Sequence, residues 1–319
     1  MIQSGSLIHY GSLALTIVLS GLGVAIGQGY IAIASLEAAN IQPRAQQQIS
    51  KVTLLAMALT ETAGILGLVM VILLFFNTKL GDPTSLYKSI AQAGTPFAIG
   101  LTGLAVSLIS ALPASQALLA IARQPFFTDK ISNIMLITMS IIQTPLIFGV
   151  IIIMLTYTQV NAVTSLNGAL KYFSAAFCLG LGAIGPIIGQ GIFAKSACWA
   201  IGFNRESYKH ILSFALLSQS IIETPIIFSL LASLLIITTQ TPSDIKTVGF
   251  IVTGVCMGLC NLMSGFSSGK TSAAACKQIG INPQNTTAIS RTSLLAQGLI
   301  DTFAIYGLII GILLILNPV

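Results

Sequence analysis

The sequence predicts an all-α membrane protein in which eight transmembrane helices form four tandem helical hairpins. Of its 319 residues, 55% are hydrophobic and only 7% are charged, and the mean hydropathy is +0.93. A soluble domain of this size could not keep its surface hydrated with so few charges. A polar residue inside an apolar segment recurs four times, and each recurrence follows a polar or proline-containing turn. We therefore divide the chain into hairpins at 1–82, 83–162, 163–242 and 243–319.

The predicted helices come in pairs, one pair in each hairpin. Their spans are 7–40 and 44–77, 91–122 and 126–158, 168–202 and 206–238, and 246–280 and 284–316. The turns inside the pairs contain Pro43, Pro125, Asn204-Arg205 and Pro283, and proline at the head of a helix is a typical start signal. Segments of about 33 residues run about 50 Å, against about 30 Å for a hydrocarbon core, so one end of each hairpin should project from the membrane.

The basic residues gather at the turn end of the hairpins. Ten of the fourteen lie there: Arg44, Lys51, Arg123, Lys130, Lys195, Arg205, Lys209, Lys270, Lys277 and Arg291. The linker end has Lys79, Lys88, Lys171 and Lys246. The positive-inside rule then predicts a multi-pass protein of a cell inner membrane, with cytoplasmic turns and both termini outward. Because the cations are scattered singly, we expect no nucleic-acid partner, and the N-terminus lacks the basic region of a signal peptide.

Small residues mark the first helix of each hairpin, most clearly at Gly21, Gly23, Gly27 and Gly29 and at Gly180, Gly182, Gly185, Gly189 and Gly191. Small side chains allow close helix approach, as in a tightly wound inner layer, although ordinary packing within one bundle is an alternative. The five cysteines (Cys178, Cys198, Cys256, Cys260 and Cys276) lie in apolar helices without a Cys-x-x-Cys pair, and we expect small core residues rather than a metal site or disulfides.

Three acids stand in the apolar second helices, at Glu61, Glu223 and Asp301, and Gln143 takes the corresponding place in hairpin 2. These four positions recur along the chain at nearly equal intervals. A charged side chain at bilayer depth is costly, so an acid there is a functional candidate.

The four positions follow their turns at one constant separation, counted from Pro43, Pro125, Arg205 and Pro283. The first helix of each hairpin has a polar residue at a slightly smaller, also constant, number of residues before the same turn residue. These residues are Gln28, Ser110, Gln190 and Ser268. In a tight antiparallel hairpin the two separations reach nearly equal depth, so Gln28 should lie beside Glu61 and Gln190 beside Glu223. Hairpin 4 pairs Asp301 with Ser268, and hairpin 2 pairs Gln143 with Ser110 as a degenerate site.

A hydroxyl follows each position directly, at Thr62, Thr144, Thr224 and Thr302. Amide, carboxylate and hydroxyl oxygens suit a hard cation such as Na⁺. Pro145 and Pro225 have no N–H and would free the carbonyls of Ile141 and Ile221 near site depth, although a simple kink explains these prolines equally well.

These motifs carry a resemblance to a known family. Residues 23–30, 36–37, 42–43, 59–65 and 121–125 resemble the c subunit, the ring-forming proteolipid, of F-type ATP synthases, and most closely its sodium-binding members. The resemblance covers essentially the whole chain as four tandem copies, whereas the usual subunit is one hairpin. It implies a two-layered rotor ring of several chains in membrane lipid, without a cofactor. It also implies two kinds of partner, a stator subunit with an essential arginine and central-stalk subunits at the cytoplasmic loops. In such a complex this chain would translocate Na⁺ or H⁺ without being catalytic itself.

The resemblance also implies that each site forms between neighbouring hairpins. One hairpin would give the glutamine and the carboxylate, and the adjacent one a hydroxyl and a carbonyl, such as Thr144 and Ile141. Tyr306 matches a tyrosine that steadies the glutamate in sodium-binding relatives, whereas Asn204-Arg205 departs from the family's loop. Because Gln143 cannot ionise, a chain would move three ions per four hairpins, which favours ATP-driven pumping over ATP synthesis.

The sequence leaves several alternatives open. A stand-alone cation channel or secondary transporter could line a central path with the three acids, although all four repeats run in the same direction and no broken substrate-binding helix is evident. Lys270 is two residues from Ser268, about 200° around the helix, so it should face away from the site and cannot replace a stator arginine. The sequence does not choose between Na⁺ and H⁺ as the transported ion, above all at Asp301. It also does not fix the number of chains in a ring or the neighbour that completes each site.

Overall fold

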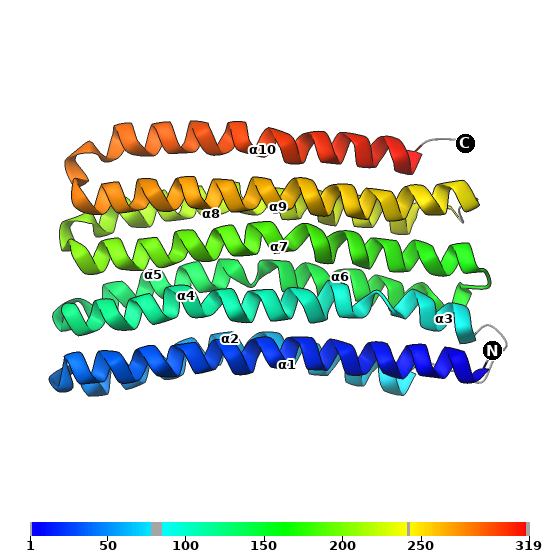
Figure 1. Cartoon of the computed structure of the whole chain (residues 1–319), viewed down its shortest axis with the longest axis horizontal. Coiled ribbons are helices and arrows are strands. Elements are labelled where there is room, and N and C mark those ends of the chain that lie inside the picture. The colour runs from blue at the N-terminus through cyan, green and yellow to red at the C-terminus, as the bar shows by residue number, and fades with distance from the viewer. Residues whose placement is uncertain (1, 78–84, 241–242, 317–319) are drawn as a thin grey trace.

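The computed structural model describes residues 2–77, 85–240 and 243–316, and within these ranges it contains helices and no strand. Over the same ranges, eight helices are long and apolar enough to cross a membrane. They run side by side as long rods, with all four hairpin turns at one end of the molecule (Figure 1). This confirms the predicted all-α membrane fold of four hairpins. Lys79 and the linker stretches 78–84 and 241–242 lie outside the described residues.

Hairpins 1, 3 and 4 each consist of two long helices joined by a single 3₁₀ turn. Their elements are α1 (Ile2–Ile41), η1 (Pro43–Ala45) and α2 (Gln46–Asn77); α7 (Leu166–Phe203), η5 (Arg205–Ser207) and α8 (Tyr208–Thr238); and α9 (Asp244–Ile281), η6 (Pro283–Asn285) and α10 (Thr286–Leu316). The bounds differ from the predicted spans by a few residues, except at the N-terminus, where α1 begins five residues earlier.

Hairpin 2 departs from the two unbroken helices predicted at 91–122 and 126–158. Its elements are α3 (Ser85–Gln92), the π-helical turn η2 (Pro96–Leu101), α4 (Thr102–Arg123), η3 (Pro125–Phe127), α5 (Thr128–Ile142), α6 (Thr144–Gln159) and η4 (Val160–Ala162). Pro96 lacks an N–H and disturbs the helical ladder where the chain widens into the π turn. In the second half Pro145 has the same effect, so α5 ends and α6 begins around Gln143.

The helices form two layers. The inner layer contains the first helix of each hairpin, in the order α1, α4, α7 and α9, and neighbours in this row pack against each other. The outer layer contains α2, α5 with α6, α8 and α10, and each of the first three outer members also touches the inner helix of the next hairpin. Hairpin 1 and α10 therefore lie at opposite edges of an open array (Figure 1).

Glycines allow the closest approach in the inner layer, between α7 and α9. A Cβ atom added to Gly189 would lie 2.1 Å from the carbonyl oxygen of Gly265, and one added to Gly269 would lie 2.2 Å from the Cα of Gly189. Backbone occupies those places, so no larger side chain fits without moving a helix. The glycine pattern thus corresponds to an inner layer of closely packed helices.

The cysteines and the turns add local detail. Cys178, Cys198 and Cys276 are buried, as expected of small core residues, whereas Cys256 and Cys260 are partly exposed. At the turn end, Gln124 donates to the Gly202 carbonyl at 2.8 Å and accepts from the Arg205 side chain at 2.7 Å. Arg205, which stands where the other turns have proline, therefore ties the third turn to the second.

Candidate functional site

The acids lie at the middle of the outer helices. Glu223 is the central residue of α8 and Asp301 the central residue of α10. Glu61 stands at the midpoint of α2. When these helices cross a bilayer, the carboxylates come close to its midplane, where an uncompensated charge is most costly.

The corresponding position of hairpin 2 is filled by a neutral clamp. The Gln143 side chain donates a 2.6 Å hydrogen bond to the Leu59 carbonyl of hairpin 1 and accepts one from the Thr62 hydroxyl. Because Pro145 interrupts the helical ladder, Gln143 occupies a short turn between α5 and α6. Its carboxamide is thus held by a carbonyl and a hydroxyl of the preceding hairpin.

Glu223 takes the corresponding position one hairpin further on. Its half-buried carboxylate lies near the Thr144 hydroxyl of hairpin 2. Gln190, predicted to lie beside Glu223, is fully buried on α7, and neither atom of its amide has a hydrogen-bond partner. The structure therefore brings Thr144 to the acid, and leaves the amide of Gln190 buried without a partner.

Asp301 is held within its own hairpin. The carboxylate is 6% exposed and accepts hydrogen bonds from Ser264 at 2.7 Å and from Ser268 at 3.4 Å, both on α9. The contact with Ser268 agrees with the depth match that the spacing around the turn predicts. Sequence reasoning missed Ser264, although it stands one helical turn from Ser268 on the same face.

Two residues expected near the acids lie elsewhere. Thr224 bonds only the Ser220 carbonyl of its own helix, so it does not reach Asp301. Tyr306 is exposed on α10 with its ring against Phe303, and among the described contacts it has no hydrogen bond to Asp301. Because α10 stands at the open edge of the array, the steadying role that the resemblance implies for Tyr306 stays a prediction.

Glu61 is exposed at the open edge of the array. Its predicted neighbour Gln28 donates a 3.4 Å hydrogen bond to the Met57 carbonyl, one helical turn before the acid, rather than to the carboxylate. At the other edge Thr302 donates to the Leu299 carbonyl, and these two residues correspond to Thr62 and Leu59 of hairpin 1. Hairpin 4 thus exposes the same pair of groups that hairpin 1 presents to Gln143.

Two further polar residues are buried near site depth. Asn261 on α9 donates its two N–H bonds to the Pro225 carbonyl and the Ser229 hydroxyl, both at 2.7 Å, and its nitrogen lies 3.4 Å from the Gly182 carbonyl, so it joins α7, α8 and α9. Sequence reasoning missed it, although a lone amide in an apolar helix was the available signal. Ser110, opposite Gln143, is buried with an unpartnered hydroxyl.

The remaining predicted groups fit this arrangement. Lys270 is exposed, with its ammonium 4.5 Å from the centre of the Phe266 ring. The described residues contain no cluster of three or more His, Cys, Asp or Glu side chains that could hold a metal ion. Asp301 and Glu223 instead each combine one carboxylate with nearby hydroxyl oxygens, and such a carboxylate can be neutralised by a proton or a small hard cation.

Comparison with known proteins gives a consistent result. The family profile of the ATP synthase C subunit matches residues 12–74, 173–236 and 251–314, which fall in hairpins 1, 3 and 4. The K subunit of an A-type ATP synthase from Methanocaldococcus jannaschii is 25% identical over 229 residues, covering 71% of this chain and 96% of that protein. The ATP synthase c subunit of Thermotoga petrophila is 39% identical over 67 residues, covering 21% of this chain and 79% of its own length. That of Alkaliphilus oremlandii is 43% identical over 63 residues, covering 20% and 72%.

Proposed function

Because the chain belongs to the family of ATP synthase C subunits, we propose that it is a rotor-ring subunit of an F-type ATP synthase or ATPase. In this proposal it carries Na⁺ or H⁺ across the membrane by reversible binding at Glu61, Glu223 and Asp301. It has no catalytic site of its own and takes part in catalysis only through the complex.

One observation carries the proposal: at two successive boundaries a mid-membrane side chain lies beside a threonine of the preceding hairpin. Thr62 donates a hydrogen bond to Gln143, and Thr144 lies near Glu223 in the same register. If the same pattern applies to hairpin 1, the site of Glu61 needs a hairpin that precedes hairpin 1. Only another copy of the chain can supply that hairpin. Thr302 and the Leu299 carbonyl of that copy would then complete the site.

Oxygen donors support Na⁺ at the two glutamates. A buried amide without a partner costs about 1–3 kcal/mol, so the orphaned amide of Gln190 is better explained when a ligand occupies the space beside it. Gln190, Glu223 and Thr144 offer an amide, a carboxylate and a hydroxyl, and Gln28 and Glu61 offer the same types at the open edge. Asp301 is satisfied by two serine hydroxyls, which suits a protonated acid as well as an ion.

Transport follows from the cost of charge in lipid. An empty, ionised site cannot face the hydrocarbon core, whereas a site neutralised by Na⁺ or H⁺ can. Emptying a site therefore needs a compensating cation, which we assign to an arginine of a stator subunit. The outer-layer position of the acids suits such a partner, because it would approach the ring from outside.

The turns and the missing acid complete the proposal. With ten basic residues on their side of the membrane, the turns would face the cytoplasm and contact central-stalk subunits, in a cell inner membrane. Each chain would carry three ions per four hairpins, because Gln143 cannot ionise. Fewer ions per turn favour ATP-driven pumping.

A stand-alone channel or transporter fits less well. It would place the acids around a central path, but they lie in the outer layer and Glu61 is exposed at an edge. We therefore keep the proposal that the chain is a subunit of a rotor ring.

Cross-linking of assembled chains tests the proposal. A Cβ added to Gly23 or Gly185 would lie 2.5 or 2.3 Å from the Cα of the facing residue on the next inner helix, Leu104 or Leu262. The register-equivalent pair across a chain junction is Met263 with Leu22, which are 60% and 50% exposed. The double variant Met263→Cys/Leu22→Cys should form a covalent ladder of chains after oxidation, and the protein should co-purify with stalk and stator subunits. The native chain, with five free cysteines, is the control, and a lone uncross-linked monomer would contradict the rotor.

A further inference from the structure

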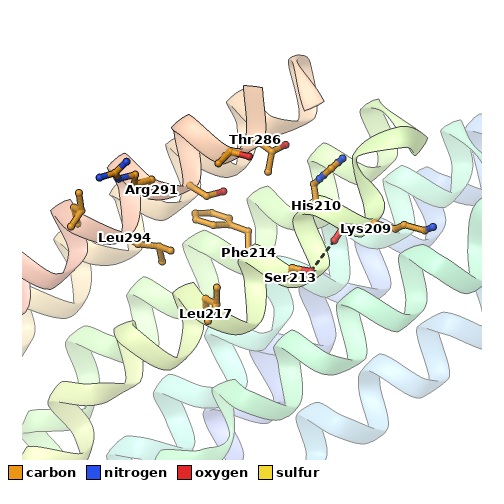
Figure 2. Close-up of a pocket in the computed structure, with 11 residues that line it drawn as sticks. Lys209, His210, Ser213, Phe214, Leu217, Thr286, Arg291 and Leu294 are labelled. Atoms are coloured by element: carbon orange, nitrogen blue, oxygen red, sulfur yellow. Dashed lines mark hydrogen bonds between the residues drawn. The ribbon is translucent and has the colours of Figure 1, made fainter. Parts of the chain in front are cut away.

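A groove on the outer face, near the turn end of hairpins 3 and 4, has the make-up of a lipid site. Its cavity volume is about 700 Å³, and α8 and α10 form its walls. Figure 2 shows the ring of Phe214 extending from α8 toward α10, with Thr286 and His210 at one end and Leu217 and Leu294 toward the other. Both walls come from one chain, so the groove does not depend on how many chains assemble.

Charge divides the groove along its length. The lining contains three basic side chains, Lys209, His210 and Arg291, all exposed, and no acid. Lys209 points away from α10 in Figure 2, so its flexible stem would have to turn for its ammonium to face a ligand in the groove. The apolar part contains Phe214 and Leu217, and the latter is 57% exposed.

The polar and apolar ends match the layers of a bilayer. Arg291 lies ten residues before Asp301, about 15 Å along the helix, and half of a hydrocarbon core is also about 15 Å. With the acids at mid-membrane, Arg291 reaches the headgroup boundary and Lys209, about 21 Å from Glu223, lies beyond it. Leu217, six residues before Glu223, falls about 9 Å from the midplane, among acyl chains.

The chain contains an internal control for this groove. Hairpins 1 and 2 form a register-equivalent groove of about 450 Å³, in which Asn133 replaces Arg291, Gln48 replaces His210 and Val52 replaces Phe214. That groove has one cation, Lys51, and one acid, Asp129. Between hairpins 2 and 3 the same level is filled by the Tyr208 ring, which packs on Phe127 and accepts a hydrogen bond from Asn133. Of these three grooves, only that of hairpins 3 and 4 combines open apolar walls with basic side chains and no acid.

We propose that the groove between α8 and α10 binds an anionic phospholipid of the leaflet at the turn end, with its phosphate at His210, Arg291 and Lys209 and its acyl chains along Phe214, Leu217 and Leu294. Charge complementarity selects the headgroup, because juxtamembrane cations attract anionic lipid. The apolar walls select a molecule with hydrocarbon chains over a free phosphate. This site is separate from the mid-membrane acids and does not depend on the transported ion.

The test uses the full chain in its native assembly, delipidated in detergent and supplied with phosphatidylglycerol that carries a photoreactive acyl chain. Cross-linked peptides should come from α8 and α10 around Leu217 and Leu294. The triple variant Lys209→Gln/His210→Gln/Arg291→Gln should bind this lipid at least about tenfold more weakly, whereas Lys51→Gln in the matched groove should leave this labelling unchanged. All four side chains are exposed, so the variants should fold.

Several results would overturn the proposal. Equal labelling by phosphatidylcholine would remove the role of charge, and competition by glycerol phosphate as strong as by phosphatidylglycerol would indicate a free-phosphate site. Undiminished labelling of the triple variant would exclude the named cations. Label that appears only after the assembly is dissociated would mean that another protein, or a second copy of the chain, covers the groove.

Discussion

The side-chain nitrogen of Gln143 donates a 2.6 Å hydrogen bond to the main-chain carbonyl of Leu59, across the boundary between hairpins 2 and 1. The Thr62 hydroxyl donates to the other end of the same amide. The neutral side chain of Gln143 thereby satisfies the Leu59 carbonyl and the Thr62 hydroxyl. If the neighbouring hairpin carried an acid at this position, these two groups would face a cation instead. The boundary between hairpins 1 and 2 is closed without an ion.

Replacing Gln143 by glutamate should open this closed position to an ion. The variant Gln143→Glu loses the donor to Leu59 and sets a carboxylate against a carbonyl oxygen, so in potassium salt the assembly should lose about 1–3 kcal/mol of stability. Sodium should restore part of it, as measured by thermal unfolding in NaCl and KCl. Gln143→Leu is the control, destabilised alike in both salts, and a glutamate variant that ignores sodium would contradict the interpretation of this position.

The Thr62 hydroxyl should contribute to stability more than its counterpart in hairpin 3. Thr62→Val leaves the amide oxygen of Gln143 without its donor and should cost about 1 kcal/mol. Thr224 bonds only a carbonyl of its own helix, so Thr224→Val should change stability by no more than about 0.5 kcal/mol. Chemical unfolding of the two variants side by side measures the difference, and equal losses would mean that the contact between Thr62 and Gln143 contributes little.

The repeat made the hairpins and the depth of the acids predictable, because turn spacing fixes the level of a residue on two antiparallel helices. The contact of Ser268 with Asp301 confirms that level. The direction in which a side chain points was not predictable: Thr144 lies near Glu223, whereas Thr224 bonds its own helix and Ser264 donates to Asp301 in its place. These choices depend on how neighbouring hairpins pack. The π turn at Pro96 was missed because membrane helices also accommodate proline without a break, as α8 does at Pro225.

Asn261 should be a strong point of the packing between hairpins 3 and 4. Asn261→Leu removes the donor to the Pro225 carbonyl and the Ser229 hydroxyl, and should destabilise the chain by about 1–3 kcal/mol. Asn133→Leu, at an exposed amide with one hydrogen bond to Tyr208, should cost no more than about 0.5 kcal/mol. Thermal unfolding of both variants tests this, and a neutral Asn261→Leu would show that the buried network is dispensable.

The inner layer should not tolerate a side chain at Gly189. In Gly189→Ala the new Cβ would lie 2.1 Å from the Gly265 carbonyl oxygen, so α7 and α9 must separate, at a cost of about 1–3 kcal/mol. Gly298→Ala on α10 meets nothing within 4 Å and should fold as well as the native chain. Thermal unfolding and gel filtration of the assembled protein should separate the two variants. Equal behaviour would contradict the close approach of these helices.

Carbodiimide labelling of the purified assembly, mapped peptide by peptide with and without Na⁺, tests the central claim most directly. We predict label at Glu61, Glu223 and Asp301 and none at Gln143, with sodium slowing the reaction at both glutamates. At Glu61 this protection should require the assembled state, because a second chain completes that site. Absence of label from the three acids would contradict ion binding at these positions. Labelling of both glutamates at rates that sodium leaves unchanged would contradict the sodium sites.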